Sequence, residues 1–326
     1  MEGDVSFLKQ MLVAVVALGA CGLVDHAHAQ ISYVASYGSD ETLCGRTTPC
    51  RTFAGALSIA PAGSEIRCLD TGAYGRVTIT KSITISCESM AAPIELSSSI
   101  PAVTINATPS DVIVLRGMDL YSFTFSPSQF GIVFNSGGSL IIEDCAVRNT
   151  VGGQASSAGI LFRPSSGTST LNISNSLFTG NGTGTQGAGV QIAPTGSGSA
   201  NVTISDSKFS GNVVGIRADT NGTSGSVDLS VVNAVVADSK YHGIVALAAT
   251  GRVFASVAGS TVTNNLGEGL RAVGANARIR VGTSWVTGNG TGVVSASGGR
   301  VQSYGDNKIN GNTTDGIISL PILEMK

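Results

Sequence analysis

The segment Gly189–Asn212, GVQIAPTGSGSANVTISDSKFSGN, contains the pattern that decides the fold. Val190 and Ile192 alternate with polar or small residues, as in a short strand with one buried face. Val202 begins the same alternation after a loop rich in Gly and Ser, and Phe209 follows a turn as the inward residue of a third strand. Three short strands joined by three turns predict one coil of a right-handed parallel β-helix.

The coil repeats along the chain. A glycine, then Ile, Val or Leu, then any residue, then an apolar or small residue recurs about every 25 residues, which is typical of a solenoid. These tetrads begin at Gly131, Gly159, Gly189, Gly215, Gly243, Gly269, Gly292 and Gly316. We therefore expect one all-β domain over residues 76–326, a single-stranded β-helix in which each coil packs on its neighbours.

Consecutive coils of a parallel β-helix lie about 4.8 Å apart, so equivalent residues stack into columns. The inner column of the first strand is predicted to contain Ile132, Ile160, Val190, Ile216, Ile244, Leu270, Val293 and Ile317. The inner column of the third strand is predicted to contain Val147, Phe178, Phe209, Val236, Val262, Val286 and Ile309.

Two turn columns are expected to hold the turns and to bind no ligand. One contains the small residues Cys145, Ser176, Ser207, Ala234, Ser260, Ser284 and Asn307. The other contains Asn181, Asn212, Asn265, Asn289 and Asn312, with Thr150 and Ser239 in the same place. Stacked amides can bond along such a column, and Cys145 is expected to be an inert, buried member of the serine row.

Residues 1–29 have the features of a secretory signal. An apolar stretch from Met11 to Val24 leads into the small-x-small site Ala27-His28-Ala29. The sequence around Cys21 also resembles a lipoprotein processing site, so lipidation there is an alternative. No second stretch of about 20 apolar residues follows, and we expect no transmembrane segment in the mature chain and a secreted, periplasmic or cell-envelope location.

Residues 30–75 are predicted to form an N-terminal cap. Helical spacing over Thr52–Ala60 places Phe53, Ala56, Leu57 and Ala60 on one face. Such a helix can cover the strand edges of the first coil, which would otherwise favour aggregation.

Five cysteines follow the signal, and four of them lie in the first quarter of the chain beyond residue 29. Export to an oxidising compartment favours disulfides, and we expect Cys44 to pair with Cys50 and Cys68 with Cys87. Metal ligation is the rival interpretation, but there is no Cys-x-x-Cys pair and no histidine nearby.

Composition excludes several classes of protein. Hydrophobic residues make up 42% of the 326 residues and charged residues only 12%, which argues against disorder. Beyond residue 29 the basic and acidic residues are equal in number, with one Trp and no basic run, so nucleic acid is not an expected partner. His242 is the only histidine in this part, which excludes a multi-histidine metal site, and we expect no metal and no cofactor.

The chain resembles secreted bacterial right-handed parallel β-helix repeat proteins of the pectate-lyase-like superfamily. The resemblance begins with Pro49-Cys50-Arg51-Thr52-Phe53 and Gly72-Ala73-Tyr74-Gly75 and continues through the Gly131–Gly316 repeats. It covers nearly all of the mature chain and implies the same solenoid. Because the group includes lyases, glycoside hydrolases, epimerases and non-catalytic surface proteins, it implies no single activity.

In the enzymes of this superfamily the substrate usually lies along the outer face of the first strand stack. One outward row is predicted to contain Val133, Leu161, Gln191, Arg217, Val245, Arg271, Val294 and Ile318. The next is predicted to contain Asn135, Arg163, Ala193, Asp219, Leu247, Val273 and Ala296. Pectate lyases of this fold need clustered acids for Ca²⁺, whereas these rows contain one acid, so no calcium site is expected.

Two segments approximate motifs of the superfamily's glycoside hydrolases. They are Tyr241-His242-Gly243 and Arg278-Ile279-Arg280. The chain has no Asp-Asp pair, and the register places Arg278–Arg280 on the second strand, away from the substrate face. We interpret both matches as chance.

One constellation remains near the start of the first strand on three adjacent coils. It contains Arg217, Lys240, Tyr241, His242, Glu268 and Arg271. In a lyase-type site the two arginines would neutralise a uronate carboxylate, and His242 or Tyr241 would move the proton. Glu268 would stack one coil from His242. The alternative is a solvated charged face.

The leading hypothesis is a secreted β-helix scaffold without catalysis that binds or displays on polysaccharide or the cell envelope. It would contact an acidic polysaccharide through Arg163, Arg217 and Arg271. The alternatives are a polysaccharide lyase or epimerase acting on a uronate-containing glycan, and a structural envelope or matrix protein. Only the short segment 320–326 follows the last tetrad, so end-to-end self-association is a further expectation.

Overall fold

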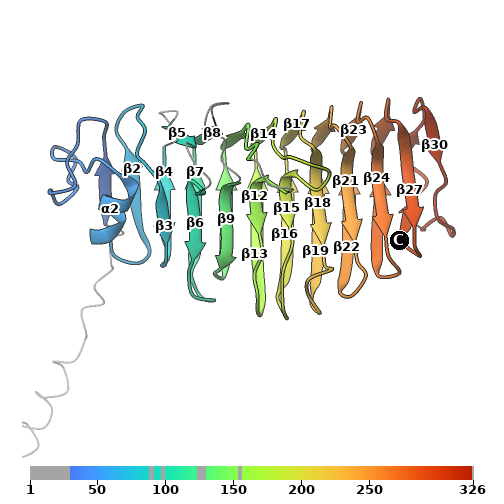
Figure 1. The fold of residues 1–326 in the computed structure, drawn as a ribbon, viewed down its shortest axis with the longest axis horizontal. Helices are drawn as coiled ribbons and strands as arrows, with labels where there is room; N and C mark the ends of the chain where they lie inside the picture. The colour runs from blue at the N-terminus through green and yellow to red at the C-terminus, as the bar shows by residue number, and fades with distance from the viewer. Residues whose placement is uncertain (1–29, 88–91, 97–99, 123–129, 153–155, 325–326) are drawn as a thin grey trace, which may run out of the picture. The chain divides into compact units, whose positions relative to one another are not determined.

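The computed structural model describes residues 30–87, 92–96, 100–122, 130–152 and 156–324. The predicted signal segment 1–29, which includes Cys21, lies outside these residues. From Ile31 onward the described chain forms one unit in which three parallel sheets surround a single core (Figure 1). The predicted parallel β-helix with a short capping helix is confirmed.

Each coil contributes one strand to each sheet, and successive coils pair in parallel (Figure 1). The first sheet contains β3 (Val77–Ile79), β6 (Val103–Asn106), β9 (Phe130–Ser136), β12 (Ala158–Phe162), β15 (Ala188–Ile192), β18 (Val214–Asp219), β21 (His242–Leu247), β24 (Glu268–Val273), β27 (Thr291–Ala296) and β30 (Thr314–Gly316).

The second sheet contains β1 (Ile31–Val34), β2 (Ser64–Cys68), β4 (Ile83–Ser86), β7 (Val112–Arg116), β10 (Ser139–Glu143), β13 (Thr168–Ser174), β16 (Ser199–Ser205), β19 (Ser226–Val232), β22 (Arg252–Ala258), β25 (Ala277–Gly282) and β28 (Arg300–Ser303). The third sheet contains β5 (Ala92–Leu96), β8 (Met118–Ser122), β11 (Ala146–Arg148), β14 (Leu177–Thr179), β17 (Lys208–Ser210), β20 (Val235–Ala237), β23 (Thr261–Thr263), β26 (Trp285–Thr287) and β29 (Lys308–Ile309).

The predicted columns are present, with one exception. From Ile132 to Val293 the first inner column pairs strand by strand, and so does the whole third-strand column. In the last coil, however, Val293 pairs with Gly316, so the register differs by one residue from the prediction. Ile317, predicted to be buried, is 85% exposed, and Ile318, predicted to point outward, packs against the core.

The two polar columns hold the turns, as predicted. In the asparagine column the side-chain amide of Asn181 donates to Asn212 Oδ1, and those of Asn265 and Asn289 donate to the asparagine of the next coil. Each asparagine oxygen also accepts the backbone N–H of the residue one coil earlier. Because these amides are buried, every bond made here avoids the free-energy penalty of an unpaired polar group.

Cys145 occupies a serine position in the other polar column. It is buried, its Sγ donates to the Glu143 carbonyl at 3.2 Å, and its backbone N–H donates to Ser176 Oγ. Burial raises the pKa of this thiol to about 12. The thiol is therefore protonated at neutral pH, consistent with the predicted packing role.

The glycine of each tetrad lies where two coils approach closely. A Cβ built on Gly243 would lie 2.6 Å from the Gly269 carbonyl oxygen and 2.7 Å from Val262 Cγ1, which belongs to the core. Gly243 and Ile244 therefore both face inward, and His242 faces outward. If side chains alternated strictly along this strand, His242 would point into the core, as Ile244 does.

The N-terminal cap contains helix α2 (Phe53–Ile59), which packs against β1, β2 and β3. Thr52 is its N-cap, and its side chain accepts the Gly55 N–H at 2.9 Å. The helix is one residue shorter at each end than predicted, because Thr52 and Ala60 have extended backbone angles and serve as caps.

The structure joins Cys44 to Cys50 and Cys68 to Cys87. The second bridge ties β2 to the residue after β4, so it links neighbouring coils of the second sheet. The cap and the solenoid are thus continuous, since β1 and β2 already belong to that sheet.

At the far end the chain lies along β28, where the Ser319 N–H donates to the Val301 carbonyl and the Leu323 N–H to the Ser303 carbonyl. This segment covers the last strand of the second sheet but leaves Ile317, Leu320 and Ile322 exposed. End-to-end self-association through this end stays a prediction. No helix among the described residues is long and apolar enough to cross a membrane.

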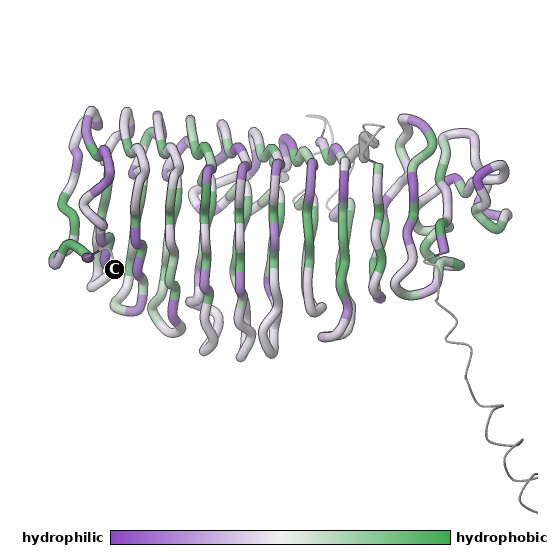
Figure 2. Tube along the Cα trace, turned by 180° about the vertical axis from the view of Figure 1, so that it is seen from behind, coloured by the Kyte–Doolittle hydropathy of each residue, from purple (hydrophilic) through white to green (hydrophobic). Residues whose placement is uncertain are grey.

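The distribution of polarity follows the same repeat. Figure 2 shows apolar segments recurring on the strands of successive coils, with paler and more polar segments in the turns. Side chains that point outward from the first sheet therefore stand on a backbone held rigidly by the coils on either side.

Candidate functional site

His242 and Glu268 face outward at the start of adjacent strands, β21 and β24. The Nδ1 atom of His242 contacts Glu268 Oε2, and Arg271 Nη1 donates to Glu268 Oε1 at 2.6 Å. The structure thus brings three of the predicted residues into contact, with Glu268 one coil from His242 as predicted. We call His242, Glu268 and Arg271 the histidine cluster.

The position of the imidazole proton follows from these contacts. The Glu268 backbone N–H can donate to Nδ1 at 3.3 Å, which needs an unprotonated Nδ1, whereas the closer contact of Nδ1 with the Glu268 carboxylate needs a protonated one. A proton on Nδ1 gives the buried Oε2 atom a donor, whereas without it Oε2 has no hydrogen-bond partner. We therefore assign the proton to Nδ1, which leaves Nε2 with a free lone pair when the ring is neutral.

The environment favours the neutral ring. Burial lowers the pKa of His242, the Glu268 carboxylate opposes this, and Arg271 and Arg217 lower the pKa further. The net direction is downward, because the charged ring would be desolvated and would face two guanidinium groups. At neutral pH His242 can therefore accept a proton at Nε2.

Gly267 allows the backbone to approach the imidazole. A Cβ at this position would lie 2.4 Å from the Tyr241 carbonyl oxygen and 2.9 Å from His242 Nδ1. Tyr241 itself is exposed, with its ring centroid 6.2 Å from that of His242.

Arg217 lies on β18, two strands from Arg271, and Val245 stands between them in register. Arg217 donates to Asp219 Oδ2 at 2.8 Å, and its side chain is only 12% exposed. The Arg217 Nε atom and the Oε1 atom of its neighbour Gln191 are buried without a hydrogen-bond partner among the described residues. Val245 is 2% exposed although it points outward, so this part of the face is well packed.

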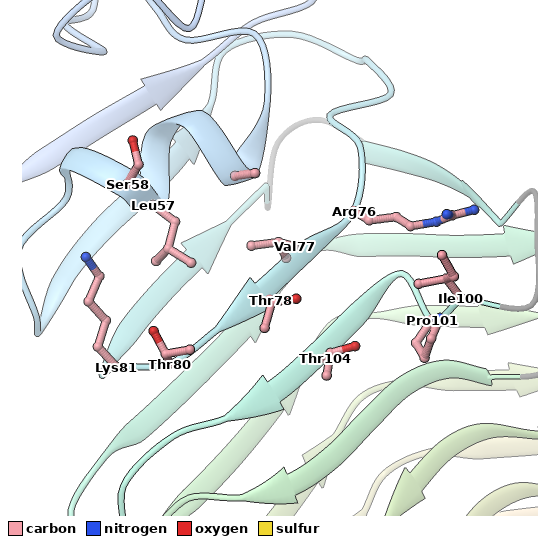
Figure 3. A pocket seen from close by; sticks show the side chains of 11 residues that line it. Leu57, Ser58, Arg76, Val77, Thr78, Thr80, Lys81, Ile100, Pro101 and Thr104 are labelled. Carbon is pink, nitrogen blue, oxygen red and sulfur yellow. The ribbon is translucent and has the colours of Figure 1, made fainter.

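Two hollows follow one another along the outer face of the first sheet. The first has a volume of about 530 Å³ and lies between α2 and strands β3 and β6 (Figure 3). The second, about 630 Å³, lies over β6, β9, β12 and β15. Because Pro101 and Thr104 line both, we treat them as one groove, the first-sheet groove.

The polar side chains that line the first-sheet groove bear hydroxyl, amide or basic groups, and apolar residues such as Leu57, Val133 and Leu161 lie between them. Its basic residues are Arg76, Lys81 and Arg163, and no Asp or Glu lines either hollow. Lys81 donates to the Ala60 carbonyl and so caps the end of α2. Arg76 points away from Lys81 (Figure 3) and has no hydrogen bond or ion pair with the described residues.

The remaining predicted residues lie apart from the histidine cluster. Arg163 is exposed in the groove and donates to Asn135 Oδ1 at 2.7 Å. Lys240 is exposed in the turn before β21. The prediction did not single out Arg76 or Gln191 as site residues. Gln191 was in the predicted outward row, but only its register with Arg217 connects it to the charged residues.

The donor set does not fit a calcium ion. Among the described residues no group of three or more His, Cys, Asp or Glu side chains could hold a metal. Asp219 and Glu268 stand on β18 and β24, and each is engaged by an arginine. A tight calcium site needs several oxygen ligands on one ion.

Comparison with known proteins finds similar folds among solved structures. No protein-family model and no curated protein matches the chain. Among solved structures, the pectate lyase Pel9A matches with a TM-score of 0.57, 13% identity, and coverage of 84% of this chain and 74% of the lyase. The chain has a pectate-lyase-like β-helix fold.

A rhamnogalacturonan lyase shares this pectate-lyase-like fold. It matches with a TM-score of 0.52 and 14% identity, over 90% of this chain and 89% of the lyase. At such identities the likeness concerns the fold, and the activity has to be argued from the side chains.

Proposed function

We propose that this protein acts on a uronate-containing polysaccharide, as a lyase or epimerase, with His242 as the base. The polymer would lie along the first-sheet groove and reach the histidine cluster. The observation that carries the proposal is the contact of His242 Nδ1 with the Glu268 carboxylate, which Arg271 also engages. Burial, with Arg271 and Arg217, lowers the pKa of the imidazole and so favours its neutral form. Two proteins of this fold, named as a pectate lyase and a rhamnogalacturonan lyase, support the substrate class.

The chemistry begins at the carbon next to the uronate carboxylate. Arg271 or Arg217 would pair with that carboxylate and stabilise the charge that develops as the C5–H bond breaks. His242 Nε2 takes the proton. In a lyase, the C4–O4 bond then breaks, a C4–C5 double bond forms, and O4 leaves with a proton, for which Tyr241 is the adjacent hydroxyl. In an epimerase, a solvent water donates a proton to C5 from the opposite face, and the hydroxide left behind takes the proton from His242.

The acid-free lining of the first-sheet groove supports an anionic polymer. Threonine hydroxyls and the amides of Asn135 and Gln191 would bond to sugar hydroxyls, while Arg76 and Arg163 would face carboxylates. The two disulfides support a secreted or periplasmic location, where such polymers would be met.

A second candidate is binding without catalysis. It is favoured by one observation: Arg217 and Arg271 are each already paired with a carboxylate, so the cluster has no net positive charge when His242 is neutral. A polymer could then be held by the groove alone.

The test is incubation with pectate, alginate and other uronate polymers in D₂O. A lyase produces unsaturated ends that absorb ultraviolet light, and an epimerase introduces deuterium at C5. Replacing His242 by Gln is expected to lower either rate by about 10²–10⁴-fold, the usual contribution of a general base. Lys208→Gln, an exposed cation on the third sheet, is the control and should leave the rate unchanged.

Two outcomes would contradict this proposal. Full activity in His242→Gln would remove His242 as the base. Binding of a polymer by the wild type without unsaturation or deuterium incorporation would favour the second candidate.

A further inference from the structure

The outer face of the second sheet carries adjacent arginines without acidic partners. Arg278 on β25 and Arg300 on β28 are directly paired in register, and both are exposed. Neighbouring strands are about 4.8 Å apart, and like charges at that separation destabilise a sheet. Neither side chain has a hydrogen bond or ion pair with the described residues.

The arrangement differs from that of six other arginines, three of which lie on the same sheet. Carboxylate partners are present for Arg67, Arg116, Arg148, Arg217, Arg252 and Arg271. The sequence thus pairs arginine with acid on several strands, yet it places Arg278 beside Arg300. An exposed pair of arginines with no acid beside it can bind an anion from outside the chain.

A third arginine extends the basic surface. Arg280 also points outward from β25, and its guanidinium carbon lies 4.9 Å from the centre of the Phe254 ring. Its Nε atom is buried without a hydrogen-bond partner. Gln302, which pairs with Arg280 in register, is 5% exposed, and its Oε1 atom also lacks a partner among the described residues.

A hollow of about 970 Å³ adjoins these residues. Its polar lining is Arg280, Ser256, Thr283, Tyr304 and Asp306, with the segment Pro321–Glu324 on one side. The Asp306 carboxylate accepts the Thr283 hydroxyl. The hollow is large enough to receive sugar rings, and it contains hydroxyl groups that could bond to them.

The rest of the face indicates which anion it suits. A row of uncharged polar side chains continues from Arg280 across four earlier strands: Ser256, Ser230, Thr203 and Asn172. A nucleic acid would need cations along its whole length for its regular phosphates. Sugar hydroxyls need hydroxyl and amide partners, with cations only where acidic groups occur.

We propose that Arg278, Arg280 and Arg300 form a second polysaccharide-binding surface, specific for glycans that carry carboxylate or sulfate groups. Guanidinium groups recognise such anions with two parallel hydrogen bonds, and the polar row would accompany the sugar chain. This surface belongs to the second sheet, so it is separate from the first-sheet groove and does not rest on the function proposed above.

The experiment separates the two sites by mutation. Binding of alginate and heparin fragments is measured by calorimetry in a variant with Arg76→Ala, Arg163→Ala, Arg217→Ala and Arg271→Ala, which weakens both the first-sheet groove and the histidine cluster. Residual binding is expected, and adding Arg278→Ser and Arg300→Ser should weaken it at least tenfold at low salt. The control replaces two arginines that have acidic partners, Arg116→Ser and Arg148→Ser, and so removes the same charge.

Stability provides a second measurement. If Arg278 and Arg300 were structural, their replacement would lower the melting temperature. We expect the melting temperature to stay the same or rise, because the substitution relieves repulsion.

Each remaining outcome would overturn the proposal. Absence of residual binding would show that the second sheet has no site, even if the first-sheet proposal holds. Residual binding equal in the Arg278/Arg300 variant and the control would place the site elsewhere. Equal affinity for inorganic sulfate and for the fragments would reduce the surface to a simple anion site.

Discussion

At the scale of single residues, His242 is the side chain whose chemistry depends most on its neighbours. Its ring is mostly buried, contacts the Glu268 carboxylate at Nδ1, and faces Arg271 and Arg217. Burial and the two guanidinium groups disfavour the charged ring, and the carboxylate favours it. The balance determines whether Nε2 is available as a base near neutral pH.

This balance can be measured without knowing the substrate. His242 is the only histidine beyond residue 29, so NMR of a chain beginning at residue 30 would follow one imidazole. We expect its pKa to lie below the ordinary value near 6.5. Since protonation occupies Nε2, any activity that uses His242 as base should decline as the pH falls through that pKa.

Variants of the neighbours give opposite shifts. Glu268→Gln removes a negative charge and should lower the His242 pKa further, whereas Arg271→Gln should raise it. A pKa above 6.5 in the wild type, or equal shifts in both variants, would show that the described contacts do not control this ring.

At the scale of the element, the second residue of each first-sheet strand from β9 to β27 is a glycine for a steric reason. In seven tetrads, from Gly131 to Gly292, a Cβ would lie 2.6–2.8 Å from a carbonyl oxygen of the next coil. Two consecutive inward residues at this corner turn the preceding residue outward. The repeated glycine thus determines which way His242 and Glu268 point.

Substitution of Gly243 tests this account. Gly243→Ala should lower the free energy of unfolding by about 1–3 kcal/mol, because the new methyl group overlaps the Gly269 carbonyl and Val262. Gly222→Ala is the control, since a Cβ there has no atom nearer than 3.7 Å. Urea unfolding of both variants gives the comparison, and equal stability of the two would reject the steric explanation.

At the scale of the whole molecule, stability is a sum over neighbouring coils. The ends have fewer neighbours, and the chain secures its N-terminal end covalently. The bridge between Cys68 and Cys87, 19 residues apart, joins adjacent coils, and α2 covers the first of them. At the other end the segment along β28 supplies only hydrogen bonds and partial burial.

Removing the long bridge should therefore destabilise the chain. The variant Cys68→Ser with Cys87→Ser is expected to lose about 3 kcal/mol in denaturant unfolding, from the greater entropy of the unfolded chain. Cys145→Ser is the matched control, because its neighbours in that column are serines with equivalent bonds. Comparable losses in both variants would mean that the bridge adds no specific stability.

The periodic part of this protein is determined by its sequence alone. Side chains that recur in every coil, such as Ile160, Phe178 and Asn212, can only be buried together by stacking, so their columns are readable without coordinates. The same holds for the adjacency of His242 and Glu268, which lie one repeat apart.

The tertiary structure decided what the repeat does not specify. Arg76 enters the groove from an early coil with no tetrad, and the last coil slips by one residue because no further coil fixes its register. The direction of His242, and the absence of acids beside Arg278 and Arg300, depend on close approaches between coils and on side chains distant in sequence. A periodic pattern determines which residues stack in the core, whereas the charged residues of the surface are not part of that pattern.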